Sequence, residues 1–233
     1  MLILSIDTAG TSGSVALCEC GAGALARDFR LIELVPLAGR MYSAQLMPQL
    51  SALLERHHLN KAAVDAYAVA SGPGSFTGLR VGLSTVKALA EIMDKPIAAV
   101  SLLQALAWRA MATVAEEGQV IAALDAARGQ VFVGEYVVRM DTLPKLLREA
   151  LLTLDDLAAE AAARPDVPVL TPDELVTSAL SARGISVQLG PRPASDVIAR
   201  LGALQIAAGQ ITSPEALDAN YIRRSDAEIF SKQ

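Results

Sequence analysis

The sequence has few aromatic residues and no excess of positive charge. Aromatic residues make up 4% of its 233 residues, and 25 acidic residues outnumber 20 basic ones, giving a net charge of −5. Proteins hold phosphates with cations and stack bases on aromatic rings. We therefore expect that this chain does not bind RNA by itself.

Cysteine and histidine are scarce as well. The sequence contains two cysteines, Cys18 and Cys20, and two histidines, His57 and His58. A Cys-x-Cys pair without further ligands is weak evidence for zinc, so we interpret it as two packing residues of a reduced, cytosolic protein. Neighbouring helical residues diverge by about 100°, so the histidines do not share a metal easily and fit a solvated helix end. Two histidines without good partners also argue against a hydrolytic triad.

Long apolar runs are missing too. The apolar start of the chain is short and has no basic leader, which argues against a signal peptide. No uninterrupted apolar stretch reaches the roughly 18 residues of a membrane span. Hydrophobic residues nevertheless make up 52% of the chain, enough to form a sizeable core.

Hydrophobic periodicity and turn residues predict alternating strands and helices, and hence an α/β fold. We expect strands at residues 2–7, 15–19, 66–70, 97–100, 120–124 and 131–133. We expect helices at residues 42–58, 76–93, 101–117 and 194–208, with Ser101 as an N-cap. Residues 140–190 are interpreted as helical pieces, chiefly 146–163, broken by prolines.

One short pattern occurs twice. A strand that ends in an aspartate, a turn with alanine and glycine, and a second strand are found around Asp7 and again around Asp125. The repeat predicts two lobes built on one plan, each opening with a hairpin whose turn carries an aspartate. We expect the first lobe at residues 1–100, joined by 214–233, and the second at residues 101–213.

The glycine-rich segment at residues 71–90 follows a strand and leads into a helix. It matches neither a Walker loop nor a dinucleotide fingerprint, and it lacks the central serine of a nucleophile elbow. Gly74, Gly78 and Gly82 lie four residues apart, so on a helix they form a stripe without side chains. Such a stripe lets a second backbone come close, either in an internal packing groove or at a contact with another chain. We adopt the contact with another chain as the hypothesis.

The turn that follows residues 2–7 also admits two interpretations. Asp7, Thr8, Ser12 and Ser14 are residue types that hold a nucleotide phosphate and its magnesium. The same types are ordinary turn formers, and spacing alone favours turn formation. Asp7, Thr8 and Ser12 are kept as candidate phosphate-binding residues, with turn formation as the favoured alternative.

Taken together, these segments resemble the TsaB family, also called YeaZ. The resemblance is carried by residues 71–90, by Ile6-Asp7-Thr8-Ala9, by Leu124-Asp125-Ala126 and by the ending Tyr221-Ile222-Arg223. It implies a two-lobed fold of the actin/Hsp70/sugar-kinase type, with ribonuclease H-like lobes and mixed sheets. It also implies a non-catalytic scaffold subunit of the bacterial machinery that adds threonylcarbamoyl to a tRNA adenosine, the t6A modification.

The resemblance further implies a set of partners. TsaB proteins pair with TsaD, the catalytic subunit, and a small ATPase, TsaE, joins them. Without its partner, the surface that pairs with TsaD is able to pair with a second copy of the chain in a homodimer, and tRNA is reached only through the complex. The chain needs no cofactor of its own, and ATP or ADP is expected only at the complex interface. The expected location is the cytoplasm, without a membrane partner.

The metal site of TsaD has no counterpart in the matching residues. TsaD carries two histidines four positions apart on one helix, a spacing that grips a metal. The matching positions here are Leu102 and Leu106, so the resemblance implies packing in place of ligands. The sequence also departs from TsaB, because Tyr42-Ser43-Ala44 stands where that family often has His-Ser-Glu or His-Thr-Gln, and Ala219-Asn220 lacks the usual proline.

The helices at residues 42–58 and 76–93 are therefore expected to form the partner-binding surface. Its expected residues are Tyr42, Leu46, Leu50, Gly74, Phe76, Gly78, Arg80, Val81 and Gly82. On this hypothesis Gly78→Ala weakens partner binding without lowering the melting temperature.

Two other functions are weighed as alternatives. One is an ATP-binding, phosphotransferase-like enzyme of the same superfamily. Against it, the turn after Asp125 reads Ala-Ala-Arg-Gly-Gln, which lacks the hydroxyls and glycines of a phosphate clamp. The other is a metalloprotease, against which the leucines at the TsaD ligand positions argue.

Overall fold

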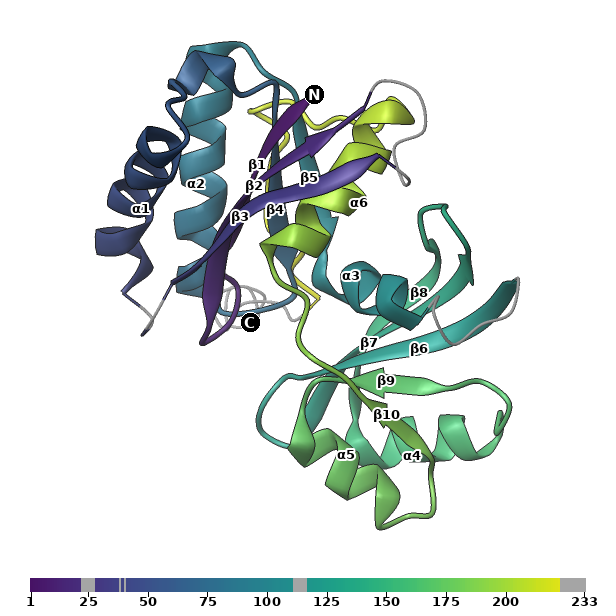
Figure 1. Ribbon diagram of the computed structural model, residues 1–233. Helices are drawn as coiled ribbons and strands as arrows, with labels where there is room; N and C mark the ends of the chain where they lie inside the picture. Colours follow the sequence, from purple (N-terminus) through teal and green to yellow (C-terminus); the bar gives the residue numbers. More distant parts are fainter. Residues whose placement is uncertain (22–27, 38, 40, 111–116, 223–233) are drawn as a thin grey trace. The chain divides into compact units, whose positions relative to one another are not determined.

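A computed structural model describes residues 1–21, 28–37, 39, 41–110 and 117–222 of the chain (Figure 1). The chain divides into two compact units. The first unit contains Met1–Ala105 and Pro193–Ala219, and the second contains Leu106–Arg192 together with residues 220–222. Among the described residues, no helix is both long and apolar enough to cross a membrane.

The first unit is built on a five-stranded mixed sheet with the strand order β3-β2-β1-β4-β5. Strands β1, β2 and β3 form an antiparallel meander, and β4 and β5 continue the sheet parallel to β1. The strands are β1 (Leu2–Asp7), β2 (Gly13–Cys20), β3 (Phe29–Leu37), β4 (Ala66–Gly72) and β5 (Ile97–Ser101).

Helices cover both faces of this sheet (Figure 1). They are α1 (Tyr42–Arg56), the short 3-10 helix η1 (Lys61–Ala63), α2 (Phe76–Met93) and α6 (Ser195–Ala207). Successive strand residues point to opposite faces. Leu4 and Tyr67 therefore face α1 and α2, whereas Ser5 and Ala68 face α6.

The second unit repeats the same plan. Its sheet has the order β10-β9-β6-β7-β8. Read from the other edge, this order is β8-β7-β6-β9-β10, and each strand corresponds to the strand at the same place in the first unit, β3-β2-β1-β4-β5. The strands are β6 (Glu117–Asp125), β7 (Gln130–Arg139), β8 (Lys145–Thr153), β9 (Val169–Thr171) and β10 (Val187–Leu189). Helices α4 (Leu154–Ala162) and α5 (Glu174–Ser181) pack on one face, around Ile121, Val133, Leu157 and Val176.

The hairpin turns of the two units also agree. In the first, the Asp7 Oδ1 atom accepts the Ala9 N–H at 2.8 Å, and in the second the Asp125 Oδ1 atom accepts the Ala127 N–H at 2.9 Å. The repeat in the sequence thus marks one supersecondary unit used twice, and the predicted two-lobe plan is confirmed.

Two element predictions were wrong. Residues 146–153 belong to strand β8, not to a helix, because β7 offers backbone partners to a segment whose leucine pattern fits either element. Helix α3 (Leu102–Arg109) follows Ser101, whose Oγ atom accepts the Gln104 N–H at 3.4 Å, but residue 117 already lies in β6. Residues 111–116 lie outside the described part of the chain.

The expected lobe boundaries need a correction. Residues 193–213, which include α6, belong to the first unit rather than the second. Helix α6 lies against β1, β2, β4 and β5, and Gly202 lets it come close, since a Cβ there would lie 2.6 Å from that of Ala68. Of the tail expected in the first lobe, residues 214–219 belong there, whereas Asn220 donates to Glu149 on β8 at 2.7 Å.

Both cysteines are packing residues, as expected. Cys18 and Cys20 are free thiols buried on strand β2. Burial, with a smaller contribution from the charge of Asp196, raises the pKa of the Cys18 thiol to about 12. A thiol with so high a pKa is protonated at neutral pH and is a poor nucleophile.

A buried serine cluster fastens α6 to the first sheet. The Ser5 hydroxyl donates to the Ser195 carbonyl at 2.5 Å, and the Ser195 hydroxyl donates to the Ser14 carbonyl at 2.6 Å. The Ser195 N–H in turn donates to the Ser14 hydroxyl at 3.0 Å. These bonds satisfy polar groups from two strands and the helix start in a site closed to water.

We predict that Ser195→Ala lowers the free energy of unfolding by about 1–3 kcal/mol, because it leaves the buried Ser14 carbonyl without its hydroxyl donor. Urea denaturation measures the loss. The matched control is Ser181→Ala on α5, which removes an exposed hydroxyl and should stay within about 0.5 kcal/mol of the unchanged chain. Equal stabilities for the two variants would contradict the assigned role of the cluster.

Candidate partner-binding surface

The glycine stripe of α2 faces the interior of the first unit, not its surface. A Cβ at Gly78 would collide with the backbone carbonyl of Thr8, and one at Gly82 would lie 2.5 Å from the Thr8 hydroxyl. Gly74 is exposed on one side, but its Cβ direction is filled by the carbonyl of Ala9. Gly78 and Gly82 therefore pack inside the chain, so the expectation that they contact a partner is wrong, and the stripe is an internal packing groove. Gly74 has an exposed side, and its contact with a partner stays a prediction.

Hydrogen bonds hold the β1–β2 turn in this groove. Thr8 Oγ1 donates to the Gly78 carbonyl at 2.7 Å, and the Ser75 N–H donates to the Ala9 carbonyl at 2.7 Å. Ser75 is also the N-cap of α2, because its side chain accepts the Gly78 N–H at 3.3 Å. The N–H groups of Ser75 and Gly78 at the start of α2 are thus hydrogen-bonded within the chain.

The apolar stripe of α1 also points inward. Tyr42, Leu46 and Leu50 are at most 3% exposed, and the Tyr42 hydroxyl donates to the Gly10 carbonyl at 2.8 Å. Their assignment to the partner surface is likewise a correction. The signal was present in the sequence, since large apolar residues at i, i+4 and i+8 ordinarily mark the core face of a helix.

The remaining three candidates lie on the outside. Phe76 and Arg80 are exposed and Val81 is half-buried on α2, where they line a shallow depression with Ser43 of α1. The Arg80 guanidinium lies 3.8 Å from the Phe76 ring centroid, a stacking that holds both side chains in place. We call this surface the α1–α2 face; its residues are Ser43, Phe76, Thr77, Arg80, Val81, Ser84 and Thr85.

Sequence reasoning missed the small residues of the α1–α2 face. Along α2 the exposed positions recur every four residues, from Phe76 through Arg80, Ser84 and Ala88 to Ile92. This second stripe has the same period as the glycines but lies on the opposite side of the helix. Its middle is small, whereas its ends are large and apolar, so a partner helix can come close at Ser84.

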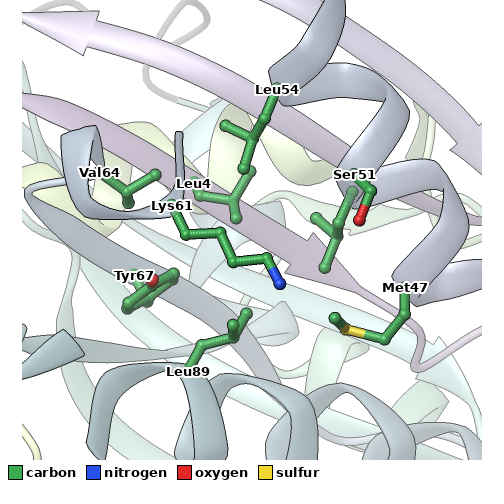
Figure 2. Close-up of a pocket in the computed structure, with 9 residues that line it drawn as sticks. Leu4, Met47, Ser51, Leu54, Lys61, Val64, Tyr67 and Leu89 are labelled. Carbon is green, nitrogen blue, oxygen red and sulfur yellow. The ribbon is translucent and has the colours of Figure 1, made fainter. Parts of the chain in front are cut away.

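A second pocket lies behind α1 (Figure 2). Apolar side chains of α1, β1, β4 and α2 line it, among them Leu4, Leu50 and Leu89, and the Lys61 side chain lies across it. Burial raises the pKa of the Tyr67 hydroxyl at its wall. The lining residues include no nucleophile paired with a base, so the pocket does not suggest catalysis.

The C-terminal end of α1 is tied to strand β3. The Glu33 carboxylate accepts from Arg56 at 2.6 Å and lies 2.7 Å from His57 Nε2. The hydrogen bond from Arg56, more than that from His57, keeps the pKa of Glu33 below its usual value. His57 is thus partly buried and paired, whereas His58 is exposed as expected of a solvated helix end.

The candidate phosphate turn has most of its polar groups engaged within the chain. Asp7 and Thr8 are buried, the Thr8 hydroxyl bonds to α2, and the Ser14 hydroxyl bonds to Ser195. Ser12 is exposed. In the second unit the matching turn places Ala127, Arg128 and Gly129 at positive φ, which forms a tight hairpin.

The positions that match the TsaD metal ligands are packed. Leu102 and Leu106 are each about 1% exposed. Within the described ranges, no group of three or more His, Cys, Asp and Glu side chains is placed to hold a metal ion.

Two units with one strand order, each a mixed five-stranded sheet with helices, define a two-lobed α/β protein whose lobes repeat one plan. The sequence model of TsaD, described as tRNA N6-adenosine threonylcarbamoyltransferase, matches residues 35–189. This chain is 30% identical to the tRNA threonylcarbamoyladenosine biosynthesis protein TsaB of Bacillus subtilis (strain 168), over 98% of this chain and 96% of that protein. The chain therefore belongs to the TsaB (YeaZ) family.

Other relatives agree with this assignment. The tRNA threonylcarbamoyladenosine biosynthesis protein TsaB of Haemophilus influenzae is 33% identical over 59% of this chain and 54% of that protein. The solved structure of YeaZ from Pseudomonas aeruginosa superposes with a TM-score of 0.76 at 27% identity, covering 94% of this chain and 99% of that one.

We predict that Gly78→Ala destabilises the isolated chain, which reverses the expectation from the sequence. The added methyl group meets the Thr8 backbone, and overpacking of about 1–3 kcal/mol exceeds the gain in helix propensity of at most about 1 kcal/mol. Thermal unfolding followed by circular dichroism measures the change. Gly190→Ala is the control, since nothing lies within 4 Å of a Cβ there. A melting temperature for Gly78→Ala at or above that of the unchanged chain would contradict the assignment of the stripe to an internal packing groove.

Proposed function

We propose that this chain is a non-catalytic subunit in the synthesis of N6-threonylcarbamoyladenosine in tRNA, where it binds and supports a TsaD-type catalytic subunit. The observation that carries the proposal is the 30% identity with Bacillus subtilis TsaB over nearly the full length of both chains. That relative is named for the biosynthesis of this modified nucleoside. Leu102 and Leu106, which are buried at the TsaD ligand positions, favour a scaffold role over a catalytic one.

The α1–α2 face is the proposed contact with the catalytic subunit. Arg80 is the one charged residue among its seven members, and the Phe76 ring beneath it adds exposed apolar area. A helix with a carboxylate opposite Arg80 and a small residue opposite Ser84 fits this face, because charge pairing sets the register and small side chains allow close approach.

The further partners follow from the same proposal. A small TsaE-type ATPase joins the pair in the cytoplasm, and tRNA is reached only through the assembled complex. The acidic, aromatic-poor composition supports this indirect route to RNA. In isolation, the α1–α2 face is available to pair with a second copy about a two-fold axis.

We predict that Ser84→Trp weakens binding to the TsaD-type subunit from the same cell by at least about tenfold, roughly 1.4 kcal/mol, because the indole keeps the partner helix away. Arg80→Glu should weaken binding as well, and more strongly at low salt. Titration calorimetry on the purified pair gives the affinities. Ser181→Trp on the exposed side of α5 is the control and should bind normally. Normal binding by both α2 variants would exclude this face as the contact.

An ATP-binding, phosphotransferase-like enzyme is the alternative function, and the Asp7 turn is the observation that favours it. We predict weak or no ATP binding by the isolated chain, because the Thr8 and Ser14 hydroxyls are already bonded within the first unit. Calorimetry with magnesium and ATP tests this. A low micromolar dissociation constant that Asp7→Ala abolishes, with the fold intact by circular dichroism, would support the enzyme instead. Nucleotide bound only in the complete complex would agree with our proposal.

A further inference from the structure

The β1–β2 turn contacts both helices of the α1–α2 face from behind. On one side the Tyr42 hydroxyl of α1 donates to the Gly10 carbonyl at 2.8 Å. On the other side Thr8 Oγ1 donates to the Gly78 carbonyl of α2 at 2.7 Å. The turn is therefore a polar bridge between two helices whose outer surfaces form the proposed docking site.

There is no spare room around this bridge. Thr8 and Tyr42 are 2% and 3% exposed, and a Cβ at Gly13 would lie 2.7 Å from both the Tyr42 ring and the Asp7 carbonyl oxygen. On the α2 side, the glycine groove already brings Gly78 against the Thr8 backbone. Close-packed interiors transmit a displacement rather than absorb it. A shift of the turn therefore moves α1 relative to α2.

From these contacts we propose that Thr8 and Tyr42 are positioning residues of the partner-binding surface, acting through the β1–β2 turn to set the spacing of α1 and α2. The inference rests on the proposed function, since it concerns the affinity of the α1–α2 face for the TsaD-type subunit. It assigns a use to the buried Tyr42 hydroxyl, which bonds to the turn. Neither residue touches the partner, because both are buried.

A consequence is that the turn and the docking surface are linked. Partner binding that fixes the helix spacing also fixes the turn. By linkage, the free energy with which partner binding stabilises the turn geometry equals the free energy with which that geometry strengthens partner binding. In this chain the aspartate-bearing turn acts as a spacer rather than as a ligand site. Asp7 contributes by fixing the shape of the turn through the Ala9 N–H.

The experiment removes one hydroxyl at a time and measures partner affinity and stability separately. Thr8→Val and Tyr42→Phe keep the shape of each side chain but delete the bond to the opposite element. We expect each variant to bind the TsaD-type subunit about three- to tenfold more weakly, the range for one lost hydrogen bond. Thr8→Ser retains the hydroxyl and should recover most of the affinity lost in Thr8→Val.

Two matched controls separate positioning from general stability. Tyr136→Phe deletes an equally buried tyrosine hydroxyl, bonded to Glu149 at 2.8 Å in the second unit, and should lower the melting temperature without changing affinity. Thr11→Val alters an exposed hydroxyl in the same turn and should change neither. If Thr8→Val fails to fold, Tyr42→Phe decides the outcome alone.

The outcomes distinguish this inference from the proposed function. Unchanged affinity in both Thr8→Val and Tyr42→Phe, with the unchanged chain binding well, overturns the positioning role and leaves the proposed function standing. Absence of binding by the unchanged chain overturns the proposed function and the positioning role together. Weaker binding by these variants but not by Tyr136→Phe supports the role assigned to the turn.

Discussion

The close approach of α2 to the β1–β2 turn is the constraint on which the first unit depends. Only glycine at position 78 lets the helix backbone reach the Thr8 carbonyl, and the Thr8 hydroxyl then bonds back to that helix. The Ser75 N–H donates a hydrogen bond to the next carbonyl of the turn, that of Ala9. With this contact in place, the orientation of α2 about its own axis is fixed, and so is the face that it presents outward.

That orientation separates two roles that the sequence places on one helix. The glycine stripe faces the turn, whereas Phe76, Arg80 and Ser84 are directed away from it. A register shift of about two residues, roughly half a helical turn, would exchange the two sets. Packing within the chain therefore determines the chemistry of the outer face, which is a stacked cation beside small polar side chains.

The sequence predicted what local patterns encode and failed where tertiary contacts decide. Helix α2 begins at a serine cap and follows a clear apolar period, so its bounds were predicted correctly. Strand β8 has leucines that suit a helix or a strand, and the presence of β7 decides between them. The spacing of the glycines implies a close approach but does not name the neighbour, and the period of α6 does not say which sheet it covers. Identifying the neighbour of the stripe requires the position of Thr8, which lies far away in sequence.

The contacts of the β1–β2 turn also bear on the choice between docking a partner and binding a nucleotide. For the Thr8 hydroxyl to bind a phosphate, it would have to leave the Gly78 carbonyl, and the groove holding α2 would loosen. Similarly, Ser14 would have to release the first turn of α6 at Ser195. A ligand at the turn thus competes with the bonds that shape the α1–α2 face. On the proposed function, hydroxyls that point inward favour a firm docking surface over a nucleotide site, and the buried leucines at the metal positions favour packing over catalysis in the same way.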